Sequence, residues 1–471
     1  MPALRGMPPP APSTAGAPIE PLPTAVTGFV GAADAGPVDT PVTVTSAAGY
    51  HATFGPTLAA DRPLGHAVDL FFANGGRQAV VVRAAGPDPA QLVPAEGPGG
   101  VHALDGSGGS DGSGVTLLVL PGLTAAHTDQ VRVALAWCAA YRAVLVLDLR
   151  PGPWTEDVRA TVERVGEHRE RAAAYHPWVV VDGASVPPGG AVAGVIARTD
   201  AERGVWKAPA GVGLHGVDAL TEAIDARGAE ELTGAGVNVL REFPGRGSLV
   251  WGARLVAGAQ TGDPAARYLS VRRLTDHVLT SVSVGLGFVR DEPSGEALWA
   301  RVRQLTEDFL HRLWLQGALA GVRVEEAYGV RCGPGETMTE ADVRAGQVVL
   351  SLWMAPVRAG EYDAHTLRCQ ARPSSQPKTG TTPVHAVDLG QVVSRYIGET
   401  EKNLSRVFDR AEGSGSVLEF DEADAVFGTR TEVRDTHDRY AGQETARLVE
   451  RMAKERGMPV RWRRRPSDGQ G

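Results

Sequence analysis

The residues of this 471-residue chain best placed to do chemistry are Asp421 and Glu422, which end the largely apolar run of residues 416–420. A buried strand that ends in two acids is the Walker B arrangement. Its first acid orders the magnesium shell, and its second polarises water for nucleotide hydrolysis. Glu419 places a further acid inside this strand, where burial is costly without a partner. Asp421 and Glu422 are therefore the candidate residues of any nucleotide site.

A nucleotide site also requires a phosphate-binding loop with a Gly-Lys pair. Only four of the 47 basic residues are lysines, namely Lys207, Lys378, Lys402 and Lys454. They follow Trp206, Pro377, Glu401 and Ala453, so the chain has no Gly-Lys dipeptide. Residues 377–383 could be a remnant of such a loop, but they lack its glycine spacing and an upstream strand. We expect no ATP turnover, no cofactor and no enzymatic activity.

Other motifs that could carry chemistry are isolated. Residues 211–216 (GVGLHG) match the dinucleotide pattern G-x-G-x-x-G, but no strand directly precedes them, which favours a glycine-rich loop. Asp148 ends an apolar run without identifiable partners, as is typical of a turn or helix-cap residue. Cys138, Cys332 and Cys369 are too widely spaced for a disulfide framework or a zinc site. We therefore expect no metal site.

Composition narrows the class of protein. The formal net charge is −8, which argues against a general nucleic-acid binder and against attraction to anionic lipid. No run of 18 apolar residues is present, so we expect no membrane insertion. The N-terminus lacks the apolar core of a signal peptide, which favours a cytoplasmic location. Hydrophobic residues make up 43% and charged residues 22%, as in globular proteins.

The apolar pattern predicts the elements that would position such residues. Residues 1–23 contain eight prolines and indicate an extended arm rather than a packed element. A packed mixed α/β region follows, interrupted by a flexible glycine-rich loop over 85–114. Apolar strands then alternate with helices, which predicts a parallel βαβαβ core. Its elements are a strand at 115–120, a helix at 125–141, a strand at 143–149, a helix at 155–174 and a strand at 178–183.

The second half of the chain has two strong signals and a polar joint. Residues 294–319 predict the clearest helix, because Leu298, Val302, Leu305 and Phe309 recur at three-and-four spacing. Residues 347–357 predict a strand. The Pro/Ser/Thr-rich stretch 371–383 indicates a linker between two segments of different composition.

The segment beyond this linker resembles the classical AAA ATPase family in residues 387–415, 416–428 and 428–452. By that resemblance Tyr396, Ile397 and Gly398 would match a pore loop. The chain ends at Gly471, before the sensor 1 strand or an arginine finger of that family is expected. We therefore interpret 384–452 as a truncated, degenerate AAA-like α/β fragment.

The first 370 residues resemble the contractile tail sheath proteins of phages and phage-like injection systems. The resemblance implies a tail-sheath fold, with the βαβαβ core and a C-terminal sheath domain. It also implies a structural subunit that stacks in hexameric rings around an inner tube and contracts to drive that tube through a target envelope. The blocks that carry it are 24–46, 64–83, 186–210, 241–254, 268–274, 296–321 and 354–362.

The same resemblance implies partners and contact regions. The partners would be further copies or sheath paralogues, the inner tube protein, and baseplate and tail-terminator proteins, in a phage tail-like particle. Subunits of this family lend strands from both terminal arms to a neighbour. The candidate inter-subunit positions are Thr24, Val26, Val349, Leu350, Leu352 and Trp353.

The chain departs from the family at both ends. Residues 1–23 lack the usual strand-forming run, and 362–370 replace a short apolar final strand. The alternative function is an AAA-type nucleotide-dependent regulator or remodeller of the same particle, acting through Asp421 and Glu422. The expected domain organisation is an arm at 1–23, an N-terminal and middle domain at 24–239, a C-terminal domain at 240–370, a linker at 371–383, the AAA-like fragment at 384–452 and a basic disordered tail at 453–471.

Overall fold

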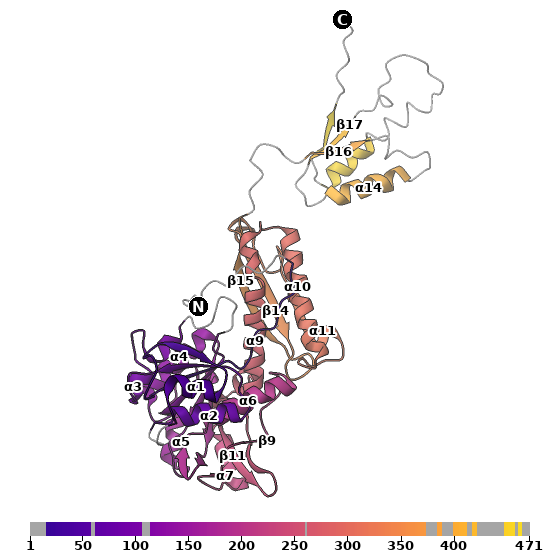
Figure 1. The fold of residues 1–471 in the computed structure, drawn as a ribbon. Helices are drawn as coiled ribbons and strands as arrows, with labels where there is room; N and C mark the ends of the chain where they lie inside the picture. The colour runs from indigo at the N-terminus through magenta and orange to yellow at the C-terminus, as the bar shows by residue number, and fades with distance from the viewer. Residues whose placement is uncertain are drawn as a thin grey trace, which may run out of the picture. The chain divides into compact units, whose positions relative to one another are not determined.

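The computed structural model divides the chain into two compact units, Met1–Ser374 and Ser375–Gly471, which are described separately (Figure 1). The first unit contains an N-terminal lobe, residues 24–267, and a C-terminal lobe, residues 269–372. The residues that the structure describes are 16–57, 62–105, 114–259, 261–373, 384–388, 399–411, 417–421, 447–456 and 460–463.

A nine-stranded sheet forms the centre of the N-terminal lobe, in the order β2-β3-β1-β4-β5-β6-β11-β12-β9. The six strands from β3 to β11 pair in parallel, whereas β2, β12 and β9 join antiparallel at the ends. The strands are β1 (Thr27–Gly31), β2 (Pro41–Val44), β3 (Ala79–Arg83), β4 (Leu117–Thr124), β5 (Val144–Asp148), β6 (Ala172–His176), β9 (Val212–Gly213), β11 (Val237–Phe243) and β12 (Gly247–Val250).

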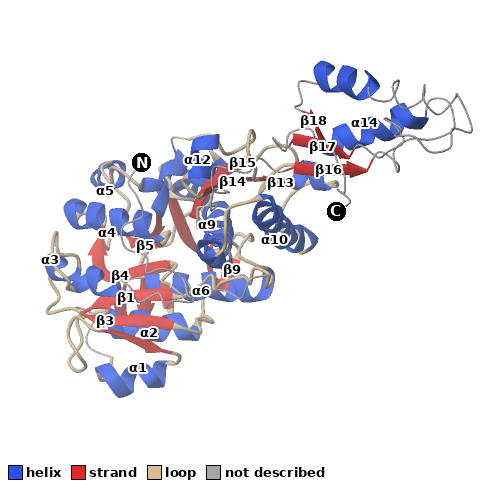
Figure 2. Ribbon diagram, turned by 90° about the horizontal axis from the view of Figure 1, so that it is seen from above, coloured by secondary structure: helices blue, strands red, loops and turns tan. Residues whose placement is uncertain are grey.

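Helices cover both faces of this sheet, which is why its parallel strands are continuously apolar (Figure 2). One face packs against α1 (Ala47–Phe54), α2 (Leu64–Ala73) and α6 (Gly189–Arg203). The other face packs against α3 (Pro89–Leu92), η1 (Gly100–Leu104), α4 (Thr128–Tyr141), α5 (Glu156–Glu163) and α7 (Ala226–Gly234). The remaining short elements of this lobe are β7 (Val179–Val181), β8 (Ala184–Val186), β10 (Ala219–Leu220), η2 (Arg169–Arg171), η3 (Val256–Ala259) and α8 (Pro264–Arg267).

Two glycines allow α2 and α6 to pack closely. A Cβ atom on Gly190 would lie 2.1 Å from the carbonyl oxygen of Ala67, and one on Gly194 would lie 2.4 Å from that of Phe71. Neither position could hold a larger residue without separating the helices. The spacing of four residues puts both glycines on one face of α6.

The C-terminal lobe packs helices against one antiparallel sheet. The sheet order is β13-β14-β15, and Val330, for example, pairs with Leu352. Its apolar core is shared by the strands and by both long helices. The elements are α9 (Leu269–Gly285), η4 (Gly287–Asp291), α10 (Glu296–Leu315), α11 (Val324–Ala327), β13 (Tyr328–Arg331), α12 (Glu340–Arg344), β14 (Gln347–Met354) and β15 (Asp363–Gln370).

The second unit contains a parallel sheet in the order β16-β17-β18. Two helices, α14 and residues 447–455, share a small apolar core with this sheet. Its labelled elements are β16 (Val384–Asp388), α14 (Glu399–Ala411), β17 (Val417–Asp421) and β18 (Val460–Arg463).

The strongest sequence patterns predicted their elements correctly. The runs at 115–120 and 143–149 form the neighbouring parallel strands β4 and β5. The 294–319 pattern forms α10, whose buried side chains include Leu298, Val302, Leu305 and Phe309. The mixed α/β class is confirmed.

The prediction for residues 155–183 was wrong in its second half. The run of alanines favours helix by propensity, and the helix was predicted to continue to residue 174. Instead α5 ends at Glu163, and Ala172–His176 forms β6, which is the third strand of the βαβαβ core after β4 and β5. Every residue of β6 is at most 1% exposed. Burial between two helical layers overrides the local propensity. The predicted strand at 178–183 forms β7 of a separate antiparallel sheet.

Residues 85–105 are not the flexible loop that their composition predicted. They form two short helical turns, α3 and η1, and bury Leu92, Val93, Val101 and Leu104 against the sheet. The glycine-rich stretch 106–113 lies outside the described residues.

Three of the predicted segment boundaries also need correction. The division at 239/240 falls inside β11, so the sheet of the N-terminal lobe continues to β12. Residues 16–23 of the predicted extended arm include Ile19, which is 1% exposed in the C-terminal lobe core. The predicted disordered tail contains β18, which pairs in parallel with β17.

Candidate functional site: the α9 junction

Helix α9 carries buried polar side chains that bond to four separate parts of the chain. We refer to these contacts as the α9 junction. Figure 1 shows α9 extending from the region of α6 along the sheet of the C-terminal lobe. Its buried polar residues are Arg273, Thr275, Asp276 and Ser281. Buried polar groups are stable only when hydrogen-bonded, so each requires a specific partner.

Arg273 joins α9 to α6 through a buried ion pair with Asp200. The guanidinium donates from Nη1 to Oδ1 at 2.8 Å and from Nη2 to Oδ2 at 2.6 Å, and the two side chains are 4% and 5% exposed. The Thr24 hydroxyl donates to Asp200 Oδ2 at 2.6 Å, and the Thr24 carbonyl accepts from Arg273 Nη2 at 2.8 Å. Both charges are therefore satisfied by the same three residues, in bidentate geometry.

A second buried pair joins α9 to η2. Arg171 Nη2 donates to Asp276 Oδ1 at 3.1 Å, Nη1 donates to Oδ2, and both side chains are 10% exposed. Nearby, burial raises the pKa of the Cys138 thiol far above its usual value. Cys138 therefore remains an unreactive core thiol. Thr275 connects the helix to β15, donating from Oγ1 to Asp363 Oδ2 at 2.8 Å.

Two further polar groups lie beside the Asp200–Arg273 pair. The hydroxyl of Tyr175 and Nδ1 of His277 are buried and have no hydrogen-bond partner among the described residues. Burial lowers the pKa of His277 to about 4, although Asp200 opposes this shift. Burial also raises the pKa of Tyr175. Both side chains are therefore neutral at pH 7.

Asp148 ends β5 and contacts the first turn of α6, whose N-cap residue is Pro188. The Asp148 side chain is 1% exposed, and Oδ1 accepts from the backbone N–H of Gly189 at the start of α6 at 2.9 Å. Burial raises its pKa to about 8, and the Gly189 hydrogen bond only partly opposes this shift. Residues 211–216 contain the two-residue edge strand β9, with no helix after it, so the dinucleotide motif is excluded.

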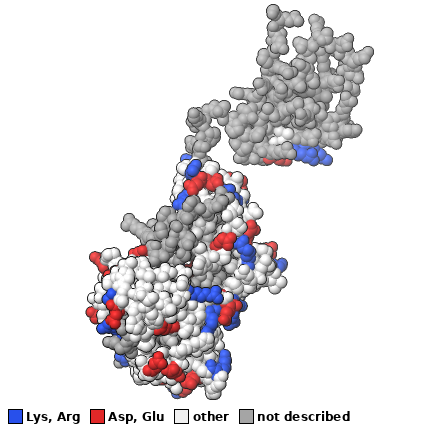
Figure 3. Space-filling model, in the orientation of Figure 1, with Lys and Arg blue, Asp and Glu red and all other residues white. Residues whose placement is uncertain are grey.

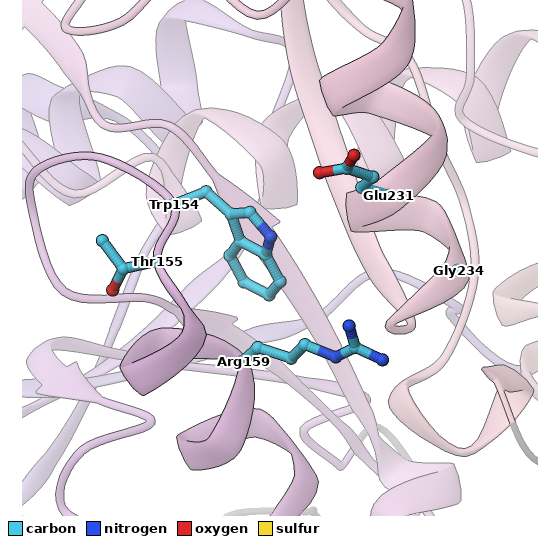
Figure 4. Close-up of a pocket in the computed structure, with 5 residues that line it drawn as sticks. All are labelled: Trp154, Thr155, Arg159, Glu231 and Gly234. Atoms are coloured by element: carbon cyan, nitrogen blue, oxygen red, sulfur yellow. The ribbon is translucent and has the colours of Figure 1, made fainter.

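One surface pocket of about 430 Å³ lies between α5 and α7 (Figure 4). Trp154, Thr155, Arg159, Glu231 and Gly234 line it. Arg159 and Glu231 are each about half exposed, and each pairs within its own helix. The two charged groups of this pocket are therefore held in exposed pairs on their own helices.

The rest of the described chain gives the same picture. It contains no group of three or more His, Cys, Asp or Glu side chains placed to hold a metal ion. None of its described helices is long and apolar enough to cross a bilayer. On the face shown in Figure 3, acidic and basic side chains are interspersed and form no extended patch of one sign.

The predicted nucleotide residues fall in the second unit. Asp421 ends β17, where its backbone pairs in register with Asp388 on one side and Arg463 on the other. Glu419 is likewise in register with Arg461, a basic residue that the sequence reasoning had placed in a disordered tail. The strand β18 follows β17, although no such strand was expected. Glu422, Tyr396, Ile397 and Gly398 lie outside the described residues.

Most of the predicted inter-subunit positions lie in the core of the chain itself. Val26, Val349, Leu350 and Leu352 are at most 3% exposed, so their side chains pack within the chain, and a role of these segments between subunits stays a prediction. Strand β14 is the middle strand of its sheet and has no free edge. The last strand of the C-terminal lobe is β15. It is formed by Asp363–Gln370, within the segment that was predicted to replace a short apolar strand. Trp353 is half-buried under the Arg331 guanidinium, 5.2 Å from its ring centroid.

Sequence reasoning missed the charged residues of the α9 junction. Arg273 and Asp276 lie four and seven positions after Leu269, on the apolar face of α9. Charges on the apolar stripe of an amphipathic helix are the available signal, but their partners Asp200 and Arg171 are distant in sequence. Among the residues of the α9 junction, only Thr24 was named from the sequence, as a candidate inter-subunit position.

Comparison with known proteins places this geometry in a family. Residues 96–254 match the family model of the phage tail sheath protein central domain, and residues 371–461 match that of the ATPase family associated with various cellular activities (AAA). No curated protein matches the sequence.

Several solved structures are similar over most of the chain. A chain of the anti-feeding prophage baseplate is 31% identical, with a TM-score of 0.61, over 77% of this chain and 95% of that one. The contracted anti-feeding prophage helical sheath is 30% identical, with a TM-score of 0.62, over 77% and 98%. The contracted PVC sheath complex, from an extracellular contractile injection system, is 27% identical, with a TM-score of 0.59, over 77% and 93%.

Proposed function

The chain belongs to the contractile tail sheath family, and on that premise we propose that it is a structural subunit of a contractile sheath. In this role, copies stack as hexameric rings around an inner tube in a phage tail-like particle. Contraction of the lattice then drives the tube through a target envelope. The observation that carries the proposal is the match to the contracted anti-feeding prophage helical sheath, which covers 77% of this chain and 98% of that one at 30% identity.

The source of energy in this proposal is the lattice. Many identical contacts make a polymer bistable, because a small gain per subunit is multiplied along its length. A subunit that moves as a block must hold its two lobes together while its neighbours change position. The two buried ion pairs of the α9 junction provide such a connection, since breaking a buried pair costs about 3–5 kcal/mol.

Free strand edges support contacts between copies. Within the described C-terminal sheet, β13 and β15 are the edge strands, and β15 has eight residues with alternating exposure and no proline. A long edge of this kind is a template for an added strand. We assign the inter-subunit contact to the β15 edge, where a terminal arm of another copy would pair.

The proposed partners follow from this role. They are further copies of the chain or sheath paralogues, the inner tube protein, and the baseplate and tail-terminator proteins of the particle. Two of the similar chains come from a baseplate and from a helical sheath. No nucleotide enters the proposed mechanism, because the sequence has no Gly-Lys pair to bind phosphate.

Electron microscopy tests the proposal. The purified chain is mixed with the inner tube protein of its particle and examined by negative stain. We expect tubes or stacked rings that form equally with and without ATP. A chain that remains monomeric at every concentration, with and without the tube protein, would contradict the proposal.

One observation favours a second candidate, a nucleotide-dependent regulator of the same particle. Residues 371–461 match the AAA family model, and the parallel strand β17 ends at Asp421, where a magnesium-binding acid is expected. Under this alternative, ATP binds the full chain and Asp421→Ala abolishes binding. Equilibrium binding of a fluorescent ATP analogue decides between them, and the structural role predicts no saturable binding.

A further inference from the structure

The chain segment Ile19–Thr24, which we call the arm root, is fastened to both lobes before β1 begins. Ile19 is 1% exposed and belongs to the core of the C-terminal lobe. Its carbonyl accepts a hydrogen bond from the Arg312 guanidinium of α10. The sequence around it is proline-rich and polar, so this burial is a specific tertiary contact rather than part of a regular element.

Gly285 on α9 leaves the space that the Ile19 side chain occupies. A Cβ atom at position 285 would lie 2.7 Å from Ile19 Cγ1 and 3.1 Å from Ile19 Cβ. Distances this short force Ile19 to move, because its β-carbon cannot rotate away. Gly285 is the last residue of α9, and its backbone has no left-handed conformation that would require glycine. The close approach of Ile19 is therefore the reason for the glycine.

Two more contacts follow along the arm root. The Leu22 N–H donates to Ser281 Oγ at 3.1 Å, one turn before Gly285 on α9. Thr24 then bonds to both members of the Asp200–Arg273 pair. Six residues are thus held at three points, on α10, on α9 and at the pair that joins α9 to α6.

We propose that the arm root remains docked on its own subunit in the sheath polymer and does not exchange with a second copy of this chain. This inference rests on the proposed sheath function.

The contacts of the arm root also determine which elements bear a force that is applied to the residues before it. A force on residues before Ile19 is opposed first by its contacts with Gly285 and Arg312, and then by Ser281. It reaches α9 and α10 before it reaches β1. The C-terminal lobe of the donor subunit, rather than its large sheet, bears the tension between copies.

A disulfide trap tests whether the arm root stays in place. The Leu22 N to Ser281 Oγ contact brings the two Cα atoms within about 7 Å, close to the separation that a disulfide bridges. The variant Leu22→Cys/Ser281→Cys is oxidised with copper phenanthroline, both as the isolated chain and after assembly with the tube protein. We expect a faster-migrating monomer in both samples on a non-reducing gel.

The single variants Leu22→Cys and Ser281→Cys are the controls for reaction with the native cysteines. A ladder of covalent multimers specific to the assembled double variant would overturn the proposal, because it shows that the segment exchanges between copies. The absence of any bond in the isolated chain would overturn it too. Failure to assemble would count against the proposed sheath function. The disulfide in the isolated chain would still show whether the arm root is docked on its own subunit.

Hydrogen exchange provides a second measurement that requires no new bond. Gly285→Ala improves helix propensity but displaces Ile19, so we expect the amide of Leu22 to exchange at least tenfold faster. Adding Ile19→Ala to this variant removes the clash, and part of the protection should return. Gly295→Ala, at an open position immediately before α10, is the control. Unchanged exchange at Leu22 in Gly285→Ala would overturn the proposal.

Discussion

Breaking the Asp200–Arg273 pair is expected to destabilise the first unit strongly. Arg273→Met leaves the Asp200 carboxylate 5% exposed, with only the Thr24 hydroxyl as a described partner. Removing one member of a buried pair costs about 3–5 kcal/mol, because the remaining charge is uncompensated. Asp200→Leu leaves the guanidinium with only the Thr24 carbonyl among these partners, so we expect a loss in the same range. The double variant loses both charges and should be less destabilised than the sum of the two.

The assay is urea denaturation of the full-length chain, with the far-UV signal followed for each single variant and the double variant. The matched control is Arg227→Met, which breaks the exposed i,i+4 pair with Glu231 on α7. Such a surface pair contributes about 0.3–0.5 kcal/mol, so this change should barely move the midpoint. The reasoning fails if either junction variant costs less than about 1 kcal/mol, or if the two losses simply add in the double variant.

Further predictions concern single positions. The raised pKa of Asp148, about 8, means that its neutral form is favoured in the fold, so its contribution to stability is lost as pH rises from about 4 towards 8. Asp148→Asn should flatten this dependence in denaturation curves at pH 5 and pH 8, and an unchanged slope would contradict it. The lowered pKa of His277, about 4, works in the opposite direction: stability falls as pH drops from about 6.5 to about 4, and His277→Gln should remove that loss. Gly190→Val should cost about 1–3 kcal/mol or more from overpacking against the α2 backbone, which lower thermal stability would reveal. Asp421→Ala should leave sheath assembly unchanged by microscopy, and loss of assembly would show that the second unit has an essential role.

Hydrophobic periodicity predicted much of the architecture because it reports burial directly. The apolar runs that form β4 and β5 and the stripe of α10 are each long enough to specify both their type and their buried face. The strand β6 was missed because alanine fits both a helix and a doubly covered strand. Only its position between β5 and β11 decides the outcome.

The α9 junction and the arm root could not be predicted because their energetics depend on distant partners. Asp200 and Arg273 are 73 residues apart, and the residue type of each alone predicts an exposed charge. Ile19 is a single apolar residue among prolines, so no periodicity marks it as core. Its binding site becomes visible only when α9 and α10 are folded beside each other, with Gly285 leaving room for the side chain.

The most direct test of the central claim is electron microscopy of the full-length chain assembled with the inner tube protein of its particle, without nucleotide. We predict a sheath-like polymer around the tube whose subunit density accommodates both lobes of the first unit. Bare tubes beside a monomeric chain, or a polymer that forms only with ATP, would contradict the account.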